Sequence, residues 1–331
     1  MLRLLFAILF IGLITIGGVV YHVNHRVSSS LNIEHKQLYT LATGKSYNHV
    51  LSDFKKLGFI DSRLAFRIHA KLNSDLINVK AGTYQLLPNM TMLQVLSLLT
   101  TGEEHQFKIT FVEGSTFKDW LIQLAETQYI QTTLADKTTE QILNLLESKY
   151  NHPEGLFFPD TYQFTANTKD IDILKLAYQR MTLELTASWQ GRAPKLPYKT
   201  PYEVLIMASM VEKETAKISE QPLISAVFIT RLAKKMRLQT DPTIIYGLGE
   251  RYTGDITYAN LREKTAYNTY RINGMPPTPI AMPGKSAIEA SLHPANTPYL
   301  YFVSKGNGEH HFSTTLKEHN NAVNKYIRGK K

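Results

Sequence analysis

One segment sets the architecture of the longer part of this chain: TPYEVLIMASMVEKET, running from Thr200 to Thr215. A threonine followed by a proline is a typical helix start, so the sequence predicts a helix over 201–216. From Val204 to Val211 apolar side chains occupy its whole circumference, which is typical of a helix buried on every side. We therefore expect this helix to lie inside a packed domain.

The last turn of this helix nevertheless carries two carboxylates, Glu212 and Glu214. At about 100° per residue they point about 200° apart, so they are not a proton-sharing pair. Each follows an apolar residue by one turn. A carboxyl group held against apolar walls has a raised pKa and can serve as a general acid. Alternatively, both side chains reach solvent or pair with Lys213 and Lys217, and periodicity does not choose between the two glutamates.

Further helices and irregular segments surround this one. Helical patterns cover 138–149, 170–189, 220–236 and, at the end of the chain, 316–327. The segment 153–162 is too apolar for an ordinary solvent loop. The segment 265–284 contains four prolines and cannot be regular secondary structure, so we expect a binding loop there. Strands are predicted at 299–304 and 311–313, joined by a turn at 306–308.

A short polar segment follows the helix predicted over 220–236. Asp241-Pro242 favours a turn, which would project Gln239 and Thr240 as hydrogen-bonding groups.

The amino-terminal segment Leu4–Tyr21 has eighteen residues without a charge. That length is just enough for a membrane-spanning helix. A cleaved signal peptide is the alternative, but no small-residue cleavage site follows closely. We expect a single retained anchor over residues 1–22, with residues 4–21 in the membrane and the remainder outside the cytoplasm. Residues 23–36 are polar and are predicted to be a linker.

The next seventy residues resemble a small α+β module over 37–104. The predicted elements are a strand at 37–42, a helix ending at Gly58, a helix from 61 to 72, an extended stretch at 77–87 and a helix from 91 closed by Gly102. The rest of the chain, 105–331, forms the larger mixed domain rich in helices. The expected fold class is α+β.

Composition excludes several kinds of function. The chain has 331 residues and no cysteine, which removes thiolate nucleophiles, iron–sulfur clusters and zinc–thiolate sites. The charge of 37 − 28 = +9 favours anionic partners, but no basic stripe with aromatics indicates nucleic acid. Adjacent His310 and His311 would point to opposite faces of a strand, so no metal site is expected. Serine-nucleophile motifs are absent, and Gly247, Gly249 and Gly254 do not have phosphate-loop spacing.

Five blocks make the chain similar to a known family. They are MASMVEKET at 207–215, RLQTDPT with IYG over 237–247, TAYNTY at 265–270, GMPP at 274–277 and PYLYFV at 298–303. In this order they resemble the endolytic murein transglycosylase, or YceG-like, family. The resemblance covers nearly the whole chain, since Lys80–Tyr84 and the following helix look like that family's LysM-like module.

The resemblance implies cleavage of peptidoglycan strands between N-acetylmuramic acid and N-acetylglucosamine, inside the strand and without water. It carries the catalytic role onto Glu214, with no metal or cofactor. Gln239, Thr240, Asn268 and Tyr270 are candidates for binding the sugar, although packing or loop-tying roles remain open. It also implies a place in the bacterial cytoplasmic (inner) membrane, action beside penicillin-binding peptidoglycan synthases, and a limit on nascent strand length.

Two other functions compete with this interpretation. One is a hydrolase of the same polymer that uses Glu214 with a second acid such as Asp241. The other is a non-catalytic anchored scaffold that binds glycan through its amino-terminal module.

Overall fold

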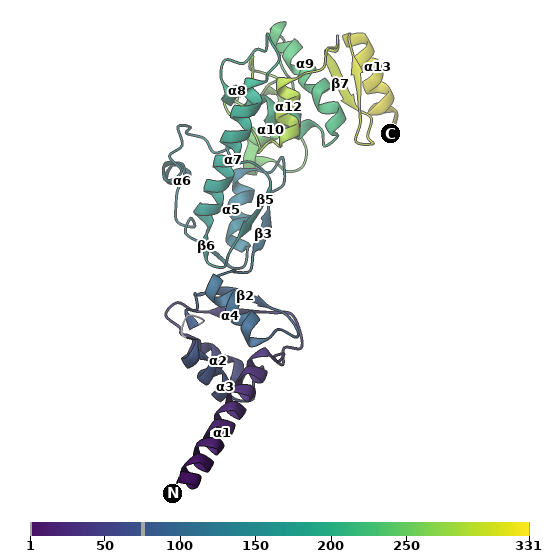
Figure 1. Cartoon of the computed structure of the whole chain (residues 1–331). Helices are drawn as coiled ribbons and strands as arrows, with labels where there is room; N and C mark the ends of the chain where they lie inside the picture. Colours follow the sequence, from purple (N-terminus) through teal and green to yellow (C-terminus); the bar gives the residue numbers. More distant parts are fainter. Residues whose placement is uncertain (1, 74–76, 331) are drawn as a thin grey trace. The chain divides into compact units, whose positions relative to one another are not determined.

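A computed structural model describes residues 2–73 and 77–330 (Figure 1). By internal contacts the chain divides into two compact units. Unit 1 contains residues 1–108 with 163–167, and unit 2 contains residues 109–162 with 168–331. Helices and short strands occur in both, so the expected α+β class is confirmed.

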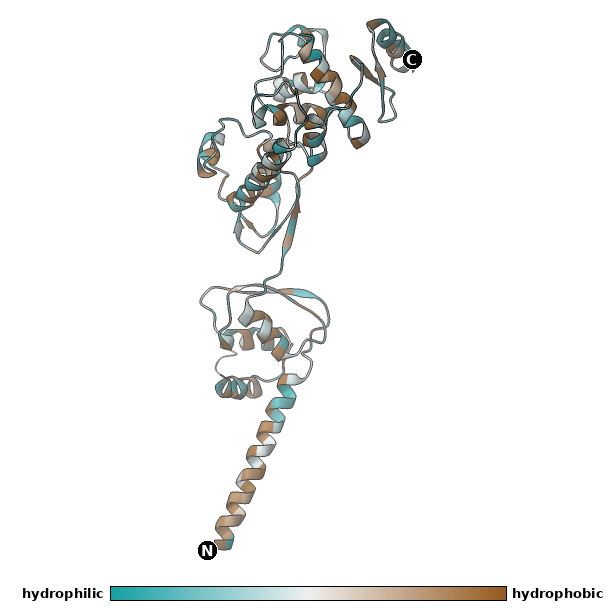
Figure 2. Cartoon of the chain, turned by 45° about the horizontal axis from the view of Figure 1, so that its top comes forward, coloured by the Kyte–Doolittle hydropathy of each residue, from teal (hydrophilic) through white to brown (hydrophobic). Residues whose placement is uncertain are grey.

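Unit 1 begins with the long helix α1, Leu2–Ser28, which Figure 2 shows as apolar over most of its length. It is the one helix among the described residues that is long and apolar enough to cross a membrane. The other elements are β1 (Gln37–Leu41), α2 (Tyr47–Lys56), α3 (Leu64–Leu72), β2 (Gly82–Leu86) and α4 (Met92–Thr101). Strands β1 and β2 pair antiparallel, with Gln37 opposite Leu86.

The structure differs from the predicted polar linker over residues 23–36. Helix α1 continues to Ser28, and the apolar side chains beyond Tyr21 are buried with those of α2, β2 and α4: Val23, Val27, Leu31 and Ile33. The segment looks polar because these apolar residues alternate with histidines, serines and asparagines. Its buried face nevertheless belongs to the core of unit 1.

Unit 2 contains most of the helices. Strand β3 (Phe107–Thr110) pairs with β5 (Thr161–Phe164), and each of these strands has residues assigned to both units. The elements of unit 2 itself are α5 (Phe117–Glu126), β4 (Ile130–Gln131), α6 (Thr139–Leu145), β6 (Thr168–Lys169), α7 (Asp170–Gln190), α8 (Pro201–Glu214), α9 (Gln221–Ala233), α10 (Asp241–Leu248), α11 (Tyr258–Arg262), α12 (Lys285–Leu292), β7 (Tyr301–Ser304), β8 (His310–Ser313) and α13 (Leu316–Tyr326).

Helix α8 lies at the centre of unit 2, as its sequence predicted. Every residue from Val204 to Val211 is buried, and the helix packs against α7, α9, α10 and α12. Its one polar residue in that run, Ser209, accepts a hydrogen bond from the Ile280 backbone N–H at 3.0 Å. The proline-rich segment is therefore fixed onto the central helix.

The two irregular segments predicted at 153–162 and 265–284 meet. Gly155 has φ +78°, and a Cβ atom there would lie 2.6 Å from the Pro279 side chain, so only glycine allows this approach. Residues 153–159 are all buried, which explains their apolar composition. Both segments thus form part of the core of unit 2.

A second segment also differs from its prediction. Asp241-Pro242 was expected to make a turn, but it opens helix α10 with Thr240 as the preceding N-cap residue. Proline is well suited to the first turn of a helix because its missing N–H has no partner there. Asp-Pro can begin either a turn or a helix, and the apolar residues that follow it favour the helix.

Candidate active site

The candidate site is built at the carboxyl-terminal end of α8. Thr200 caps the start of the helix by accepting a hydrogen bond from the Glu203 N–H, and Glu214 is its last residue. Glu214 as a whole residue is half-buried, but its carboxyl group is enclosed by protein. Burial around a helix end thus produces a desolvated carboxyl, one of the two alternatives that the sequence left open.

Burial and three neighbours set the acidity of Glu214. Burial raises its pKa to about 7, and the negative charge of Asp241 acts in the same direction. The Thr240 hydroxyl donates a short hydrogen bond to Oε1 and, together with the charge of Arg231, opposes this shift. The group can therefore hold a proton near neutral pH and release it there, as a general acid and base must.

Thr240 is held in place by two other buried threonines. Its backbone N–H donates to Oγ1 of Thr269 at 3.0 Å, and its carbonyl accepts from Thr243 Oγ1 at 2.8 Å. The hydroxyls of Thr243 and Thr269 are 2.9 Å apart. This cluster ties the start of α10 to the segment 265–284 and aims the Thr240 hydroxyl at Glu214.

Arg231 on α9, which sequence reasoning missed, supports the segment before Thr240. Its guanidinium is buried and donates to the carbonyls of Arg237 at 3.2 Å and Leu238 at 2.7 Å. It also approaches Gln239 Oε1 at 3.4 Å. Gln239 itself takes a left-handed backbone with φ 54°. The available signal was a charged residue on an otherwise apolar helix.

Tyr270 and Asn268 occupy different places in the site. The Tyr270 hydroxyl donates to Asp241 Oδ1 at 2.6 Å, which brings it close to the carboxyl of Glu214. Asn268 is buried, and its amide nitrogen donates to three carbonyls around α11, the shortest being Glu263 O at 2.6 Å. Its Oδ1 accepts from the Tyr270 N–H at 3.0 Å. The expectation that Asn268 contacts sugar therefore changes to a role in holding the Tyr270 loop.

The structure distinguishes the two glutamates of α8, which periodicity did not. Glu212 Oε2 accepts a hydrogen bond from the backbone N–H of Gly284 at 3.0 Å, at the start of α12. Burial raises the pKa of Glu212 as well, but this bond opposes the shift. Glu212 thus braces α12, while Glu214 faces the threonine cluster and Tyr270.

A further buried carboxyl, Glu154, was not anticipated. It lies in the apolar segment 153–162 and is 4% exposed, and burial raises its pKa to about 7. Both of its oxygens accept the Phe117 backbone N–H, at 3.1 and 3.2 Å, at the first turn of α5. A single acidic residue within an apolar run was the sequence signal. Because both oxygens are committed to the backbone, Glu154 acts as a brace.

His310 and His311 have separate partners. The His310 ring lies 2.8 Å from a carboxylate oxygen of Glu220, whereas His311 packs against Tyr326. In the described part of the chain no group of three or more histidine or acidic side chains is arranged to hold a metal ion.

Comparison with known proteins places this geometry in context. A sequence profile described as the YceG-like family matches residues 39–325. An endolytic murein transglycosylase of Bacillus subtilis is 34% identical over 307 residues, covering 88% of this chain and 84% of the relative.

Two more distant relatives cover more of the chain, and a solved structure covers the same share. The endolytic murein transglycosylases of two Streptococcus pneumoniae strains are 26% identical over 361 positions, which cover 98% of this chain but 65% of theirs. A crystal structure of a yceG-like protein from Listeria monocytogenes is 29% identical with a TM-score of 0.53, covering 88% of this chain and 100% of that one.

Proposed function

The chain belongs to the YceG-like family, and from this premise we propose that it is a lytic transglycosylase that cleaves peptidoglycan glycan strands internally. The bond that breaks joins N-acetylmuramic acid to N-acetylglucosamine. The product is a 1,6-anhydro end, formed without water.

Glu214 supplies both proton transfers. Its carboxylic acid protonates the glycosidic oxygen as the bond to the muramic acid C1 breaks. The resulting carboxylate then accepts the proton of the C6 hydroxyl, whose oxygen attacks C1 of the same sugar. One bond from C1 to oxygen replaces another, and Glu214 ends protonated as it began. One carboxyl suffices because the nucleophile belongs to the substrate, whereas glycosidases that use water need two.

The observation that carries this proposal is the enclosed carboxyl of Glu214, with its pKa raised to about 7 and the Thr240 hydroxyl bonded to it. Gln239 and Tyr270 are proposed to orient the sugar, since Gln239 directly precedes Thr240 and the Tyr270 hydroxyl donates to Asp241.

The remaining parts of the chain fit a protein that works on the outer face of a membrane. We propose that residues 4–21 of α1 span the bacterial cytoplasmic membrane once, with everything after them outside the cytoplasm. The LysM-like module over 37–104 and the catalytic domain over 105–331 would then meet nascent strands beside penicillin-binding synthases and limit their length.

A hydrolase remains the second candidate because of one observation. Asp241 is close enough to Glu214 for its charge to raise the Glu214 pKa, so a second carboxylate is present at the site. Such an enzyme would add water at C1 and leave reducing ends.

The test digests purified peptidoglycan with the full chain in neutral detergent and analyses the products by mass spectrometry. The parent protein should release internal fragments whose ends are lighter by one water. The cleavage rate of Glu214→Gln should be at least about 100-fold lower than that of the parent. Glu212→Gln, the matched control on the opposite face of α8, should keep most of the parent rate.

The products discriminate among the three functions. Ends that carry an added water favour the hydrolase, and absence of cleavage by every variant favours a glycan-binding scaffold. Equal cleavage by the parent and by Glu214→Gln would move catalysis to another residue.

A further inference from the structure

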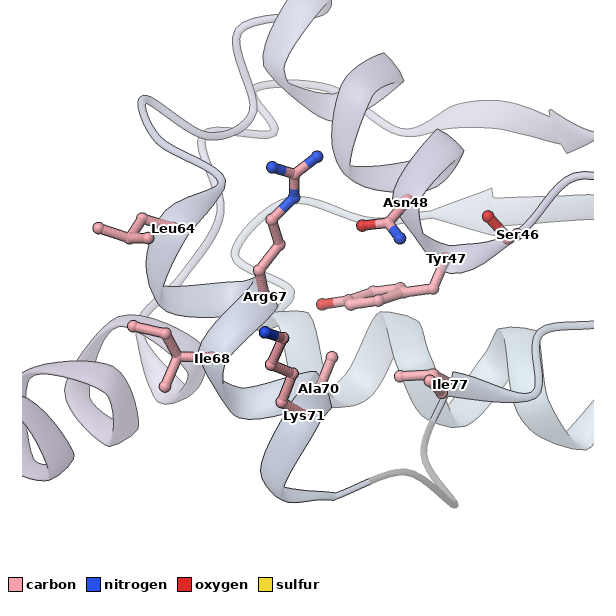
Figure 3. A pocket seen from close by; sticks show the side chains of 9 residues that line it. All are labelled: Ser46, Tyr47, Asn48, Leu64, Arg67, Ile68, Ala70, Lys71 and Ile77. Atoms are coloured by element: carbon pink, nitrogen blue, oxygen red, sulfur yellow. The ribbon is translucent and has the colours of Figure 1, made fainter.

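Unit 1 holds a cavity of about 620 Å3 between α2 and α3, seen from close by in Figure 3. Two cationic side chains, Arg67 and Lys71, line it from successive turns of α3. The lining residues that the structure describes include no aspartate or glutamate. Both cations are exposed, so the described lining presents positive charge to solvent.

A buried hydroxyl points into the same space. Tyr47 on α2 is 4% exposed, and its hydroxyl oxygen has no hydrogen-bond partner among the residues described. In Figure 3 its ring extends toward α3, with the hydroxyl on the side of Lys71, while the guanidinium of Arg67 points away from it. Since buried polar groups are almost always bonded, an orphaned hydroxyl in a cavity that two cations also line favours an anionic acceptor.

The cavity lies next to the helix that is proposed to span the membrane. A second cavity between α1 and α3 shares Leu64 and Ile68 with the first, and Thr15 and Val19 of α1 line its other side. Both of these α1 residues fall within residues 4–21. If that segment is in the bilayer, α3 lies at the level of the lipid headgroups.

The sequence of α3 suits that level. Leu64, Ile68 and Leu72 form one stripe along the helix, and the basic side chains form the adjacent one: Arg63, Arg67 and Lys71. Leu64 and Leu72 remain 66% and 68% exposed. Apolar and basic stripes side by side, with leucines left exposed, are typical of helices that lie in the membrane interface.

We propose that this cavity binds the phosphate of an anionic phospholipid headgroup in the leaflet that surrounds the outer end of α1. Arg67 and Lys71 neutralise the phosphate, and Tyr47 donates a hydrogen bond to one of its oxygens. Leu64 and Ile68 contact the glycerol and the first acyl carbons. The proposal rests on the membrane anchoring proposed above, but not on the chemistry of Glu214.

The test titrates the full chain, in neutral detergent, with dihexanoyl phosphatidylglycerol, dihexanoyl phosphatidylcholine and inorganic phosphate by calorimetry. Phosphatidylglycerol should bind the most tightly. Removing both cations in Arg67→Gln/Lys71→Gln should weaken it about 30-fold, from roughly fivefold per basic residue near an anionic surface. The charge-matched control Lys55→Gln/Lys56→Gln, on the exposed end of α2, should stay within twofold.

Tyr47→Phe removes one oxygen atom and leaves the buried ring in place, so it keeps the proposal testable if the double variant is unstable. It should weaken phosphatidylglycerol binding by roughly fivefold with an unchanged melting temperature. Unchanged binding in both variants would overturn the proposal. So would phosphate binding as tight as the lipid, or displacement of the lipid by a peptidoglycan disaccharide.

The proposal of lipid binding and the proposal of Glu214 catalysis can each be contradicted without affecting the other. Glu214→Gln should bind the lipid as the parent does, while Arg67→Gln/Lys71→Gln should still cleave peptidoglycan in detergent solution.

Discussion

The acidity of Glu214 depends on individual neighbours whose effects have opposite signs. If its protonated form starts the reaction, kcat/KM should fall about tenfold per pH unit above pH 7, where burial holds the pKa. Asp241→Asn removes the charge that raises this pKa. The fall in kcat/KM at high pH should therefore begin at a lower pH, while the activity at low pH is retained. Thr240→Val removes the hydrogen bond that lowers the pKa of Glu214, so the fall in kcat/KM should begin at a higher pH.

A pH–rate profile of the three proteins on the same peptidoglycan checks this. Loss of activity at every pH in Asp241→Asn would instead identify Asp241 as a second catalytic carboxylate, as in the hydrolase alternative.

Glu154 makes the stability of unit 2 depend on pH. Its pKa is about 7 when folded and near 4.5 in an unfolded chain, so between these values the folded state binds more protons. The free energy of unfolding should therefore fall as the pH rises from 4.5 to 7, by up to about 3 kcal/mol from this group. Glu214 acts in the same direction.

Glu154→Gln should remove this share of the pH dependence. Urea unfolding at pH 5 and pH 8 measures it, with the exposed Glu126→Gln as the control. An identical pH dependence in Glu154→Gln and the parent would show that Glu154 is ionised throughout.

At the scale of elements, α8 combines the central packing of unit 2 with its candidate acid. Met207 is fully buried, so Met207→Ala should lower the free energy of unfolding by about 2–5 kcal/mol. Leu183→Ala on α7, where the leucine is 68% exposed, should change it by less than about 0.5 kcal/mol. Urea denaturation compares the two, and an equal effect would place Met207 outside the core.

Elements with a strong internal pattern could be predicted from the sequence. Helices α7 and α8 were, because α7 has a helical pattern of apolar residues and α8 has an apolar run that follows the Thr200-Pro201 start, and the proline-rich segment was expected to be irregular. Helix α10 was not, because Asp241-Pro242 begins turns as readily as helices. The threonine cluster, the buried Arg231 and the bond between Glu212 and Gly284 join residues far apart in sequence, which no local pattern encodes.

At the scale of the whole molecule, the folded part begins earlier in the chain than composition suggests. Val23 and Val27 are buried in unit 1, so a soluble chain that begins at Tyr21 should keep them and one that begins at Ser28 should lose them. The second should be less stable by about 2–4 kcal/mol. Calorimetry of both, with Val23→Ala in the full chain as the untruncated comparison, measures this. Equal melting temperatures would show that the end of α1 contributes nothing.

The continuity of α1 into the core of unit 1 makes its length a matter of rotational phase. One residue inserted after Tyr21 would turn the apolar span before it by about 100° relative to Val23 and Val27, which stay packed in unit 1, whereas seven residues, close to two full turns, would restore the phase. Any lengthening of α1 that keeps the faces of its apolar span in phase with unit 1 must therefore come in whole turns.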